Sequence, residues 1–194
     1  MNPSKEFSLY EIAEDQAGYF SLAQARELGL QRNQIYRELE RGKFERAAWG
    51  VYRFVQFPAS RFEAIHVAVL HAGEEAVVGF DTALYIYDLS DLIPDEIHLI
   101  LPRTSSRRRT GIRMHTTSLE AEDITLWEGL PITTVARTIA DVAGAHQAED
   151  HIDLAIHQAL RRGMTTRDKI QSQVARLSFQ MRQRLIAIVE GVQL

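Results

Sequence analysis

The stretch from Tyr19 to Phe54 constrains the fold of this chain most strongly, because it predicts two short helices followed by a β-hairpin. Ser21 is suited to cap the first helix, and Gln24, three residues on, completes a capping-box pattern. Gly29 is expected to end that helix, and a second helix is expected from about Gln31 to Arg41. This order of elements is typical of a winged helix-turn-helix.

The second helix is expected to have an apolar face and a polar face. At about 100° per residue, Ile35 and Leu39 lie on the buried side, and amides and guanidiniums lie opposite. Such groups can contact base edges and phosphates. Two strand-like pieces around Trp49-Gly50 follow as a candidate wing. The candidate DNA-binding residues are Gln31, Arg32, Asn33, Gln34, Tyr36, Arg37, Arg41, Arg46 and Arg53.

A different class of function is also open for this stretch. Helix pairs joined by a glycine turn occur in proteins that never bind DNA, and arginine on a helix surface is often only solvated. An adaptor would use the winged helix to bind another protein. That hypothesis is favoured if Tyr36 and Trp49 lie in an exposed apolar patch.

The 194 residues suffice for one large domain or two small ones. The break at residues 57–59, Phe-Pro-Ala, predicts a winged helix-turn-helix domain at 1–57 and a second domain at 58–194. With no cysteine, neither disulfides nor thiolate metal sites can form. The N-terminus has no apolar signal core, and no apolar run approaches the roughly 20 residues that span a bilayer. We therefore expect a cytoplasmic protein without a membrane partner.

The second domain is expected to combine a short sheet with helices. A helix at about 61–71 opens it, a strand at 77–79 follows, and Asp81 is predicted to cap a short helix. Strands at 97–101 and 112–116 are predicted to form a hairpin. Helices are expected at about 134–143, 148–162, 166–176 and 178–189, with Thr165 starting a capping box. The fold class is therefore α+β: an N-terminal winged helix-turn-helix, then a mixed α/β domain with a short sheet and a helical C-terminal part.

Charge is distributed in blocks of opposite sign, although the net charge is only −4. Residues 1–57 carry eight Lys/Arg and eight Asp/Glu, and residues 103–113 carry five arginines and no acid. The second segment is a candidate second surface for nucleic acid or a partner. The alternative is a solvated loop that balances the acidic blocks. Its arginines are Arg103, Arg107, Arg108, Arg109 and Arg113.

The sequence predicts neither an enzyme, a metal site nor a cofactor. His66 and His71 are five residues apart, which does not match a helical zinc site, and both are expected on a helix surface. Asp95 and Glu96 faintly resemble the acidic signature of nucleases, but neighbours on a strand point in opposite directions. A nuclease-like enzyme that the winged helix targets to DNA is the alternative function.

Residues over about 18–145 form an ordered set. The set consists of Ser21, Ala25, Leu28 to Leu30, Arg41-Gly42, Phe44, Arg46, Gly50 to Arg53, Asp81 to Leu84, Asp88-Leu89, Ile97 to Pro102, Gly111, His115, Gly129 to Thr134, Arg137-Thr138 and Asp141. In this order the set resembles the AbiEi-type antitoxins of type IV toxin–antitoxin, or abortive infection, systems and their regulator relatives.

The resemblance implies an autorepressor whose winged helix binds operator repeats upstream of its own operon. It also implies that the second domain opposes a nucleotidyltransferase-like toxin without necessarily touching it. At the wing the chain departs from that pattern, since Ala47-Ala48-Trp49 stands where further basic residues are frequent. The operator sequence and the oligomeric state do not follow from the sequence.

Overall fold

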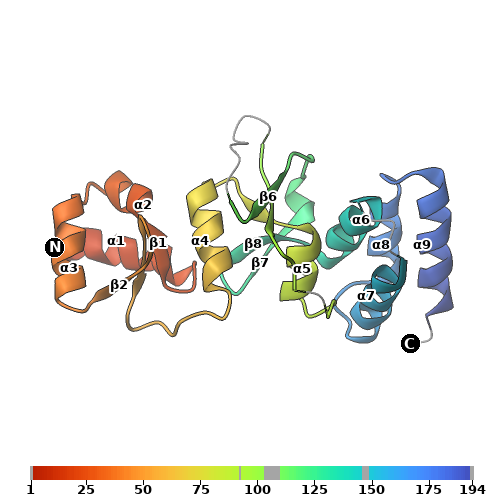
Figure 1. The fold of residues 1–194 in the computed structure, drawn as a ribbon, viewed down its shortest axis with the longest axis horizontal. Helices are drawn as coiled ribbons and strands as arrows, with labels where there is room; N and C mark the ends of the chain where they lie inside the picture. The colour runs from red at the N-terminus through yellow and green to blue at the C-terminus, as the bar shows by residue number, and fades with distance from the viewer. Residues whose placement is uncertain (1, 92, 103–109, 146–148, 193–194) are drawn as a thin grey trace. The chain divides into compact units, whose positions relative to one another are not determined.

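The structure is a computed structural model that describes residues 2–91, 93–102, 110–145 and 149–192. The chain divides into two compact units, and each is described by itself. The first contains Met1–Ala76 and Leu126–Leu130, and the second contains Val77–Thr125 and Pro131–Leu194. Figure 1 shows the elements of both units, with the part of the first unit up to residue 76 coloured from red to yellow.

The first unit begins with helices and a small antiparallel sheet in the order that the sequence predicts. The three strands lie in the order β1-β3-β2, so β3 is central, and Tyr19 pairs with Arg53. The elements are α1 (Pro3–Glu14), β1 (Tyr19–Ser21), α2 (Leu22–Glu27), α3 (Arg32–Glu40), β2 (Phe44–Ala48), β3 (Val51–Phe54) and α4 (Glu63–Ala72). The predicted helix pair and hairpin are therefore present.

An aromatic core holds these elements together. Phe20 and Phe54 are each packed against Phe44, with ring centroids 5.0 and 4.7 Å apart. Leu9 of α1 and Ile35 of α3 are fully buried in the same cluster. Each of these side chains removes enough apolar surface from water to contribute about 1.5–3 kcal/mol before entropy is counted. The core thus fixes α3 on the sheet and leaves its opposite face outside.

Local signals set the boundaries of the helix pair. The Ser21 side chain accepts from the Gln24 N–H at 3.1 Å, and the Gln24 side chain accepts from the Ser21 N–H at 2.8 Å, which completes the predicted capping box. Gly29 after α2 and Gly42 after α3 both have φ of +70°, a conformation that glycine adopts without steric cost. Each helix end is therefore specified by the glycine that follows it.

Helix α4 belongs to the first unit, so the predicted boundary at residue 57 is wrong. The Tyr19 hydroxyl donates to Glu63 at 3.0 Å, and the His66 ring stacks on Tyr19 at 4.8 Å. The segment that carries Gly129 also packs here, against the backbone of Ala17. The break at 57–59 is a turn inside this unit rather than a boundary between domains.

His66 is buried, against the prediction that it lies on a helix surface, whereas His71 is exposed as expected. The His66 side chain is 2% exposed, because the side of α4 that carries it packs against β1. Helical spacing alone does not show which side of α4 a neighbouring strand covers. Burial lowers the pKa of His66 to about 4.

The second unit is built on a mixed five-stranded sheet in the order β6-β5-β4-β8-β7. Its central strands are nearly fully buried, as expected for strands covered on both faces. Its strands, its 3₁₀ turn and the helix after β4 are β4 (Val77–Val78), α5 (Phe80–Ile86), β5 (Ile97–Ile100), β6 (Ile112–His115), η2 (Ala121–Asp123), β7 (Ile124–Trp127) and β8 (Leu130–Thr133). The α+β fold class is confirmed.

The predicted hairpin between the strands at 97–101 and 112–116 is wrong, because β5 and β6 pair in parallel. Ile97 lies opposite Ile112, and Ile100 lies opposite His115. Two apolar runs show that two strands can pair but do not specify whether they pair in parallel or antiparallel. β6 is consequently an edge strand beside β5.

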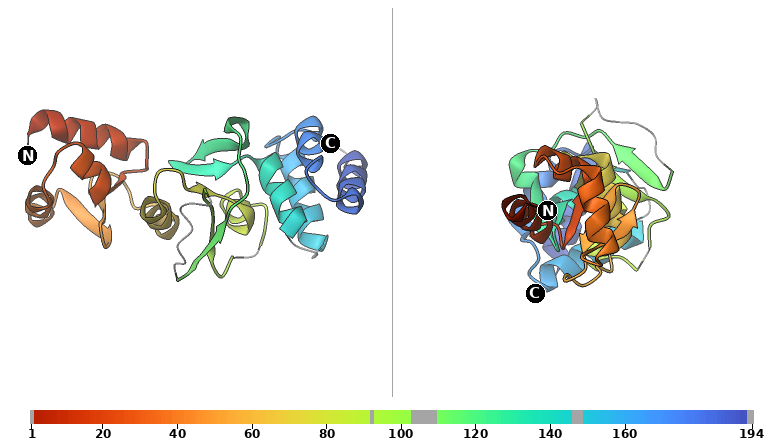
Figure 2. Two further views of the ribbon diagram at one scale, coloured as in Figure 1. Left: turned by 90° about the horizontal axis from the view of Figure 1, so that it is seen from above. Right: turned by 90° about the vertical axis from the view of Figure 1, so that its left-hand side faces the viewer.

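The C-terminal helices gather on one side of this sheet, as Figures 1 and 2 show. α6 packs against α5, α7 and α8, and its Val135, Ile139 and Val142 are buried at helical spacing. Of the described helices, none is both long and apolar enough to cross a membrane. The helices are α6 (Val135–Ala145), α7 (Glu149–Arg161), α8 (Arg167–Val174) and α9 (Phe179–Gly191).

Two predicted helix caps differ in the structure. Gly79, not Asp81, is the N-cap of α5, and Asp81 lies in the first turn. Thr166, not Thr165, caps α8 by accepting from the Lys169 N–H at 3.3 Å. In each case the N-cap lies one or two residues from the one that the capping pattern favoured, which is the usual uncertainty of a helix boundary.

Candidate nucleic-acid interface

Helix α3 presents its polar face to solvent. Ile35 is fully buried, while Arg32, Asn33 and Arg37 are exposed. This is the division that the 3.6-residue period predicted. Guanidiniums and a primary amide on an exposed helix can form bidentate contacts with guanine and adenine in a major groove.

The N-terminal turn of α3 determines which amide is available. The Gln31 N–H donates to Oε1 of Gln34 at 2.7 Å, so the Gln34 carbonyl oxygen caps the helix. A bidentate contact to adenine needs both the oxygen and the nitrogen of an amide. Asn33 is therefore better placed for such a contact than Gln34, and Gln31 supplies only its backbone to the cap.

A group of guanidiniums and aromatic rings joins α3 to the turn between β2 and β3. Nε of Arg32 donates to the Tyr36 hydroxyl at 2.8 Å, and the Arg32 guanidinium lies 5.3 Å from the centroid of the Trp49 ring. The Arg46 guanidinium lies 5.0 Å from the same ring. These distances fall within the range of cation–π interactions. The hydrophobic surface at Trp49 is thus bordered by positive charge and is not a purely apolar patch.

Two arginines of the predicted interface are engaged inside the first unit. Arg53 is buried, at 6% exposure, donates to the Phe57 carbonyl, and its Nε donates to Glu45 at 2.8 Å. Arg53 is buried because α1 and α4 both pack on the central strand that carries it. It is therefore a structural residue, and its prediction as a DNA contact is wrong. Arg41 forms an ion pair with the buried Glu38 at 2.8 Å but is itself exposed.

The predicted second surface is only partly described. Arg103, Arg107, Arg108 and Arg109 lie outside the described residues. Arg113 is exposed on β6. The proposal that this segment contacts nucleic acid therefore stays a prediction.

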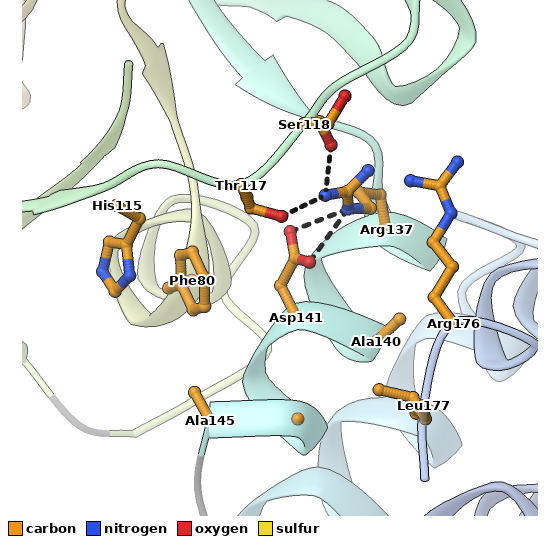
Figure 3. Close-up of a pocket in the computed structure, with 11 residues that line it drawn as sticks. Phe80, His115, Thr117, Ser118, Arg137, Ala140, Asp141, Ala145, Arg176 and Leu177 are labelled. Carbon is orange, nitrogen blue, oxygen red and sulfur yellow. Dashed lines mark hydrogen bonds and ion pairs between the residues drawn. The ribbon is translucent and has the colours of Figure 1, made fainter. Parts of the chain in front are cut away.

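The second unit contains a buried ionic network that the sequence analysis missed. The Arg137 guanidinium donates to Asp123 at 2.5 Å and to both oxygens of Asp141 at 2.9 Å. The side chains of Arg137 and Asp123 are only 2% and 1% exposed. The Arg137 guanidinium also donates to the Thr117 hydroxyl and to the Ser118 carbonyl, as Figure 3 shows. Every edge of the guanidinium is therefore occupied.

Asp123 is the centre of this network. Burial by itself raises the pKa of the Asp123 carboxyl, but hydrogen bonds from the Glu120 N–H and from Gln173, with the guanidiniums of Arg137 and Arg176, lower it overall. The carboxylate is therefore held ionised. It joins the turn η2 to helices α6 and α8, which are far apart in the sequence.

Asp141 is affected in the opposite direction. Burial raises the pKa of the Asp141 carboxyl, and the nearby Arg137 offsets only part of that rise. The spacing of Arg137 and Asp141, four residues apart on one helix, is the signal that could have revealed this pair. The other members could not be found from spacing.

A pocket of about 510 Å³ lies over this network within the second unit. Arg137, Asp141 and Arg176 line one part, and the His115 ring, stacked on Phe80 at 3.7 Å, lines another (Figure 3). Its charges are largely balanced, because each carboxylate is paired with a guanidinium. Over the described part of the chain, no group of three or more His, Asp or Glu side chains could hold a metal ion.

Asp95 and Glu96, the faint nuclease-like pair, are both exposed at the start of β5. They lie in the bend before that strand, and among the residues that the structure describes they belong to no group of three or more His, Asp or Glu side chains that could hold a metal ion.

Comparison with known proteins supports the resemblance at the N-terminus. Residues 8–55 match the family described as "Transcriptional regulator, AbiEi antitoxin". The match contains α2, α3 and the two strands of the wing, together with part of α1. No curated protein matches the chain.

The fold of the whole chain has a solved counterpart. The chain is similar to the RV2827C protein from Mycobacterium tuberculosis, known from a crystal structure, with a TM-score of 0.55 and 13% sequence identity. The similarity covers 98% of this chain and 78% of that one, and at this identity it shows the fold alone. The family match shows that residues 8–55 are similar to the AbiEi-type transcriptional regulators and antitoxins, which supports the predicted resemblance over this segment.

Proposed function

We propose that this chain is a DNA-binding transcriptional autorepressor and the antitoxin of a type IV toxin–antitoxin system. In this proposal the first unit binds operator repeats upstream of its own operon. The observation that carries it is the exposed polar face of α3, with Arg32, Asn33 and Arg37, beside a wing that carries Arg46. The match of residues 8–55 to a transcriptional-regulator family supports it.

Specificity is assigned to the N-terminal half of α3. In helix-turn-helix proteins the first residues of the second helix contact base edges in the major groove. Asn33 would pair with adenine, and Arg37 would contact guanine or a phosphate. One good bidentate contact provides about 1–3 kcal/mol of discrimination, so its loss lowers specific affinity roughly 5- to 150-fold.

The antitoxin role is assigned to the second unit. The resemblance implies that this part opposes a nucleotidyltransferase-like toxin, and direct contact with the toxin is not required. A regulator of chromosomal DNA would act in the cytoplasm. The pocket beside Arg137 has no assigned part in this role.

The proposal is tested by gel retardation with a duplex from upstream of the gene and a scrambled duplex of equal composition. Retardation of the upstream duplex should weaken steeply with salt, because phosphate contacts release counterions. Asn33→Ala should lose roughly 5- to 150-fold of the parent's preference for the upstream duplex while melting at the parent's temperature. Absence of retardation at low salt would remove the DNA-binding proposal.

The alternative functions make different predictions. A nuclease would cleave DNA in the presence of a divalent cation and lose that activity in Asp95→Ala; we expect no cleavage with either protein. A protein adaptor would need an apolar patch at Tyr36 and Trp49, whereas two guanidiniums lie beside the Trp49 ring. The surface therefore favours a polyanion over an apolar protein partner.

A further inference from the structure

Trp49 is a large aromatic side chain at the turn between β2 and β3, and it is 71% exposed. At this exposure the indole lies outside the core, although every residue of the neighbouring strand β3 is buried. The ring is therefore accessible to a ligand.

Positive charge borders this ring from two different elements. Arg32 comes from the first turn of α3 and Arg46 comes from β2, and their guanidiniums lie 5.3 and 5.0 Å from the Trp49 centroid. Both arginines are exposed. The Trp49 ring thus has one guanidinium from α3 and one from the wing beside it.

The turn that carries Trp49 is anchored through its backbone. Nε2 of His71 lies 2.8 Å from the Trp49 carbonyl oxygen, within hydrogen-bond distance. The Leu22 N–H donates to the Gly50 carbonyl at 2.8 Å, and Gly50 has a φ of +76°. With two successive carbonyls held, the backbone that presents the indole is fixed before any ligand arrives, which lowers the entropy cost of binding.

We propose that Trp49 is itself a DNA contact, whose indole packs on the deoxyribose of the strand that borders the groove occupied by α3, with Arg32 and Arg46 on the adjacent phosphates. This inference rests on the proposed function. It assigns to the wing an aromatic contact in place of the basic residues that the AbiEi pattern often has there. Because every nucleotide has the same sugar, the contact adds affinity without sequence preference.

An aromatic contact and a charged contact change different quantities. Removing the indole should weaken binding at every salt concentration and leave the salt slope unchanged, because no counterion release is lost. By analogy with base–aromatic stacking, the loss is about 5- to 150-fold. Removing a guanidinium should instead reduce the magnitude of the slope by about 1.

The experiment compares Trp49→Ala, Trp49→Phe and Arg46→Ala with the parent, using fluorescence anisotropy of labelled upstream and scrambled duplexes at several salt concentrations. Phe179→Ala is the matched control, since Phe179 is a 74%-exposed aromatic on α9 of the second unit. Thermal melting confirms that each variant folds. The chain has two tryptophans, so Trp49 emission is followed in a Trp127→Phe background as unlabelled DNA is added.

We expect Trp49→Ala to lose affinity for both duplexes alike at unchanged slope, Trp49→Phe to retain most of it, and DNA to change Trp49 emission. Parent-like affinity of Trp49→Ala with no change in emission overturns the inference. The proposed function then stands if Asn33→Ala still loses the preference for the upstream duplex over the scrambled duplex. A parent that binds neither duplex overturns both, and a loss confined to the upstream duplex overturns the sequence-independent contact.

Discussion

Lowering the pH should destabilise the first unit through His66. Its imidazole is 2% exposed, and its Nε2 atom has no hydrogen-bond partner among the described residues. Burial lowers the pKa of His66 from 6.5 to about 4, because the low-dielectric surroundings disfavour the charged ring. The unfolded chain therefore binds this proton more readily than the folded one.

The sign and size of the effect follow from these two pKa values. The stabilisation is fully present above pH 6.5, decreases as the pH falls, and its loss levels off below pH 4 at about 3 kcal/mol. Between pH 7.5 and pH 5 the expected loss in free energy of unfolding is about 2 kcal/mol. For a marginally stable domain this is a large share of the total.

The assay is urea unfolding at pH 7.5 and pH 5, followed by tryptophan fluorescence. The proteins carry Trp127→Phe, because Trp127 ends β7 of the five-stranded sheet, whereas Trp49 lies in the first unit and its emission reports on that unit. His66→Phe keeps a ring on Tyr19 but cannot titrate, and it should lose about 2 kcal/mol less than the parent over this range.

The control is His71→Gln, which changes an exposed histidine on the same helix. It should still lose about 2 kcal/mol between the two pH values, because the buried imidazole of His66 is retained. If His66→Phe loses as much stability as the parent, the buried imidazole is not the source of the pH dependence. The argument from burial would then be refuted.

Three further substitutions test separate parts of the structure. Arg137→Met leaves Asp123 buried without its main partner and should lower the free energy of unfolding by about 3–5 kcal/mol, measured by circular dichroism in urea. Gly129→Ala should lower the melting temperature far more than Gly42→Ala, since an added Cβ at Gly129 would lie 2.8 Å from a backbone nitrogen and none lies near Gly42. Arg53→Met should lower the melting temperature and leave the salt slope of DNA binding unchanged, because its guanidinium is buried in the first unit.

The helix pair and the wing could be predicted from the sequence because their signals are local. Ser21 and Gln24 cap a helix through their own backbone neighbours, and Gly29 and Gly42 adopt the positive φ that a helix end requires. The exposed face of α3 follows from the 3.6-residue period alone. None of these inferences depends on what else packs nearby.

The wrong predictions all depend on contacts between distant segments. The burial of Arg53 is set by helices α1 and α4, which cover the central strand. The parallel direction of β6 relative to β5 is a pairing between two separate segments that neither segment specifies by itself. The burial of His66 is set by Tyr19, 47 positions earlier in the sequence. Periodicity within a segment carries no information about such neighbours.

The network in the second unit was missed for the same reason. Only the pair Arg137 and Asp141 is local, while Asp123 approaches from the turn η2 and Arg176 from the turn that follows α8. The resemblance did include Arg137 and Asp141 in its ordered set of residues. The structure supplies a physical reason for arginine at this position, since one planar guanidinium donates to two carboxylates, a hydroxyl and a carbonyl at once.

The neutral balance of residues 1–57 does not conflict with DNA binding, because the structure distributes the charges unevenly. Lys43, Arg41 and Arg53 form ion pairs with glutamates of the same unit.

Three other guanidiniums of that unit have no carboxylate partner among the described residues and lie exposed on α3 and the wing: Arg32, Arg37 and Arg46. If these three contact phosphates, the salt slope is about −3 for each bound chain; if all eight basic residues did, it would be about −7. A measured slope steeper than about −5 would show that other cations also contact the duplex, and the arginines at 103–113 would be the first to substitute.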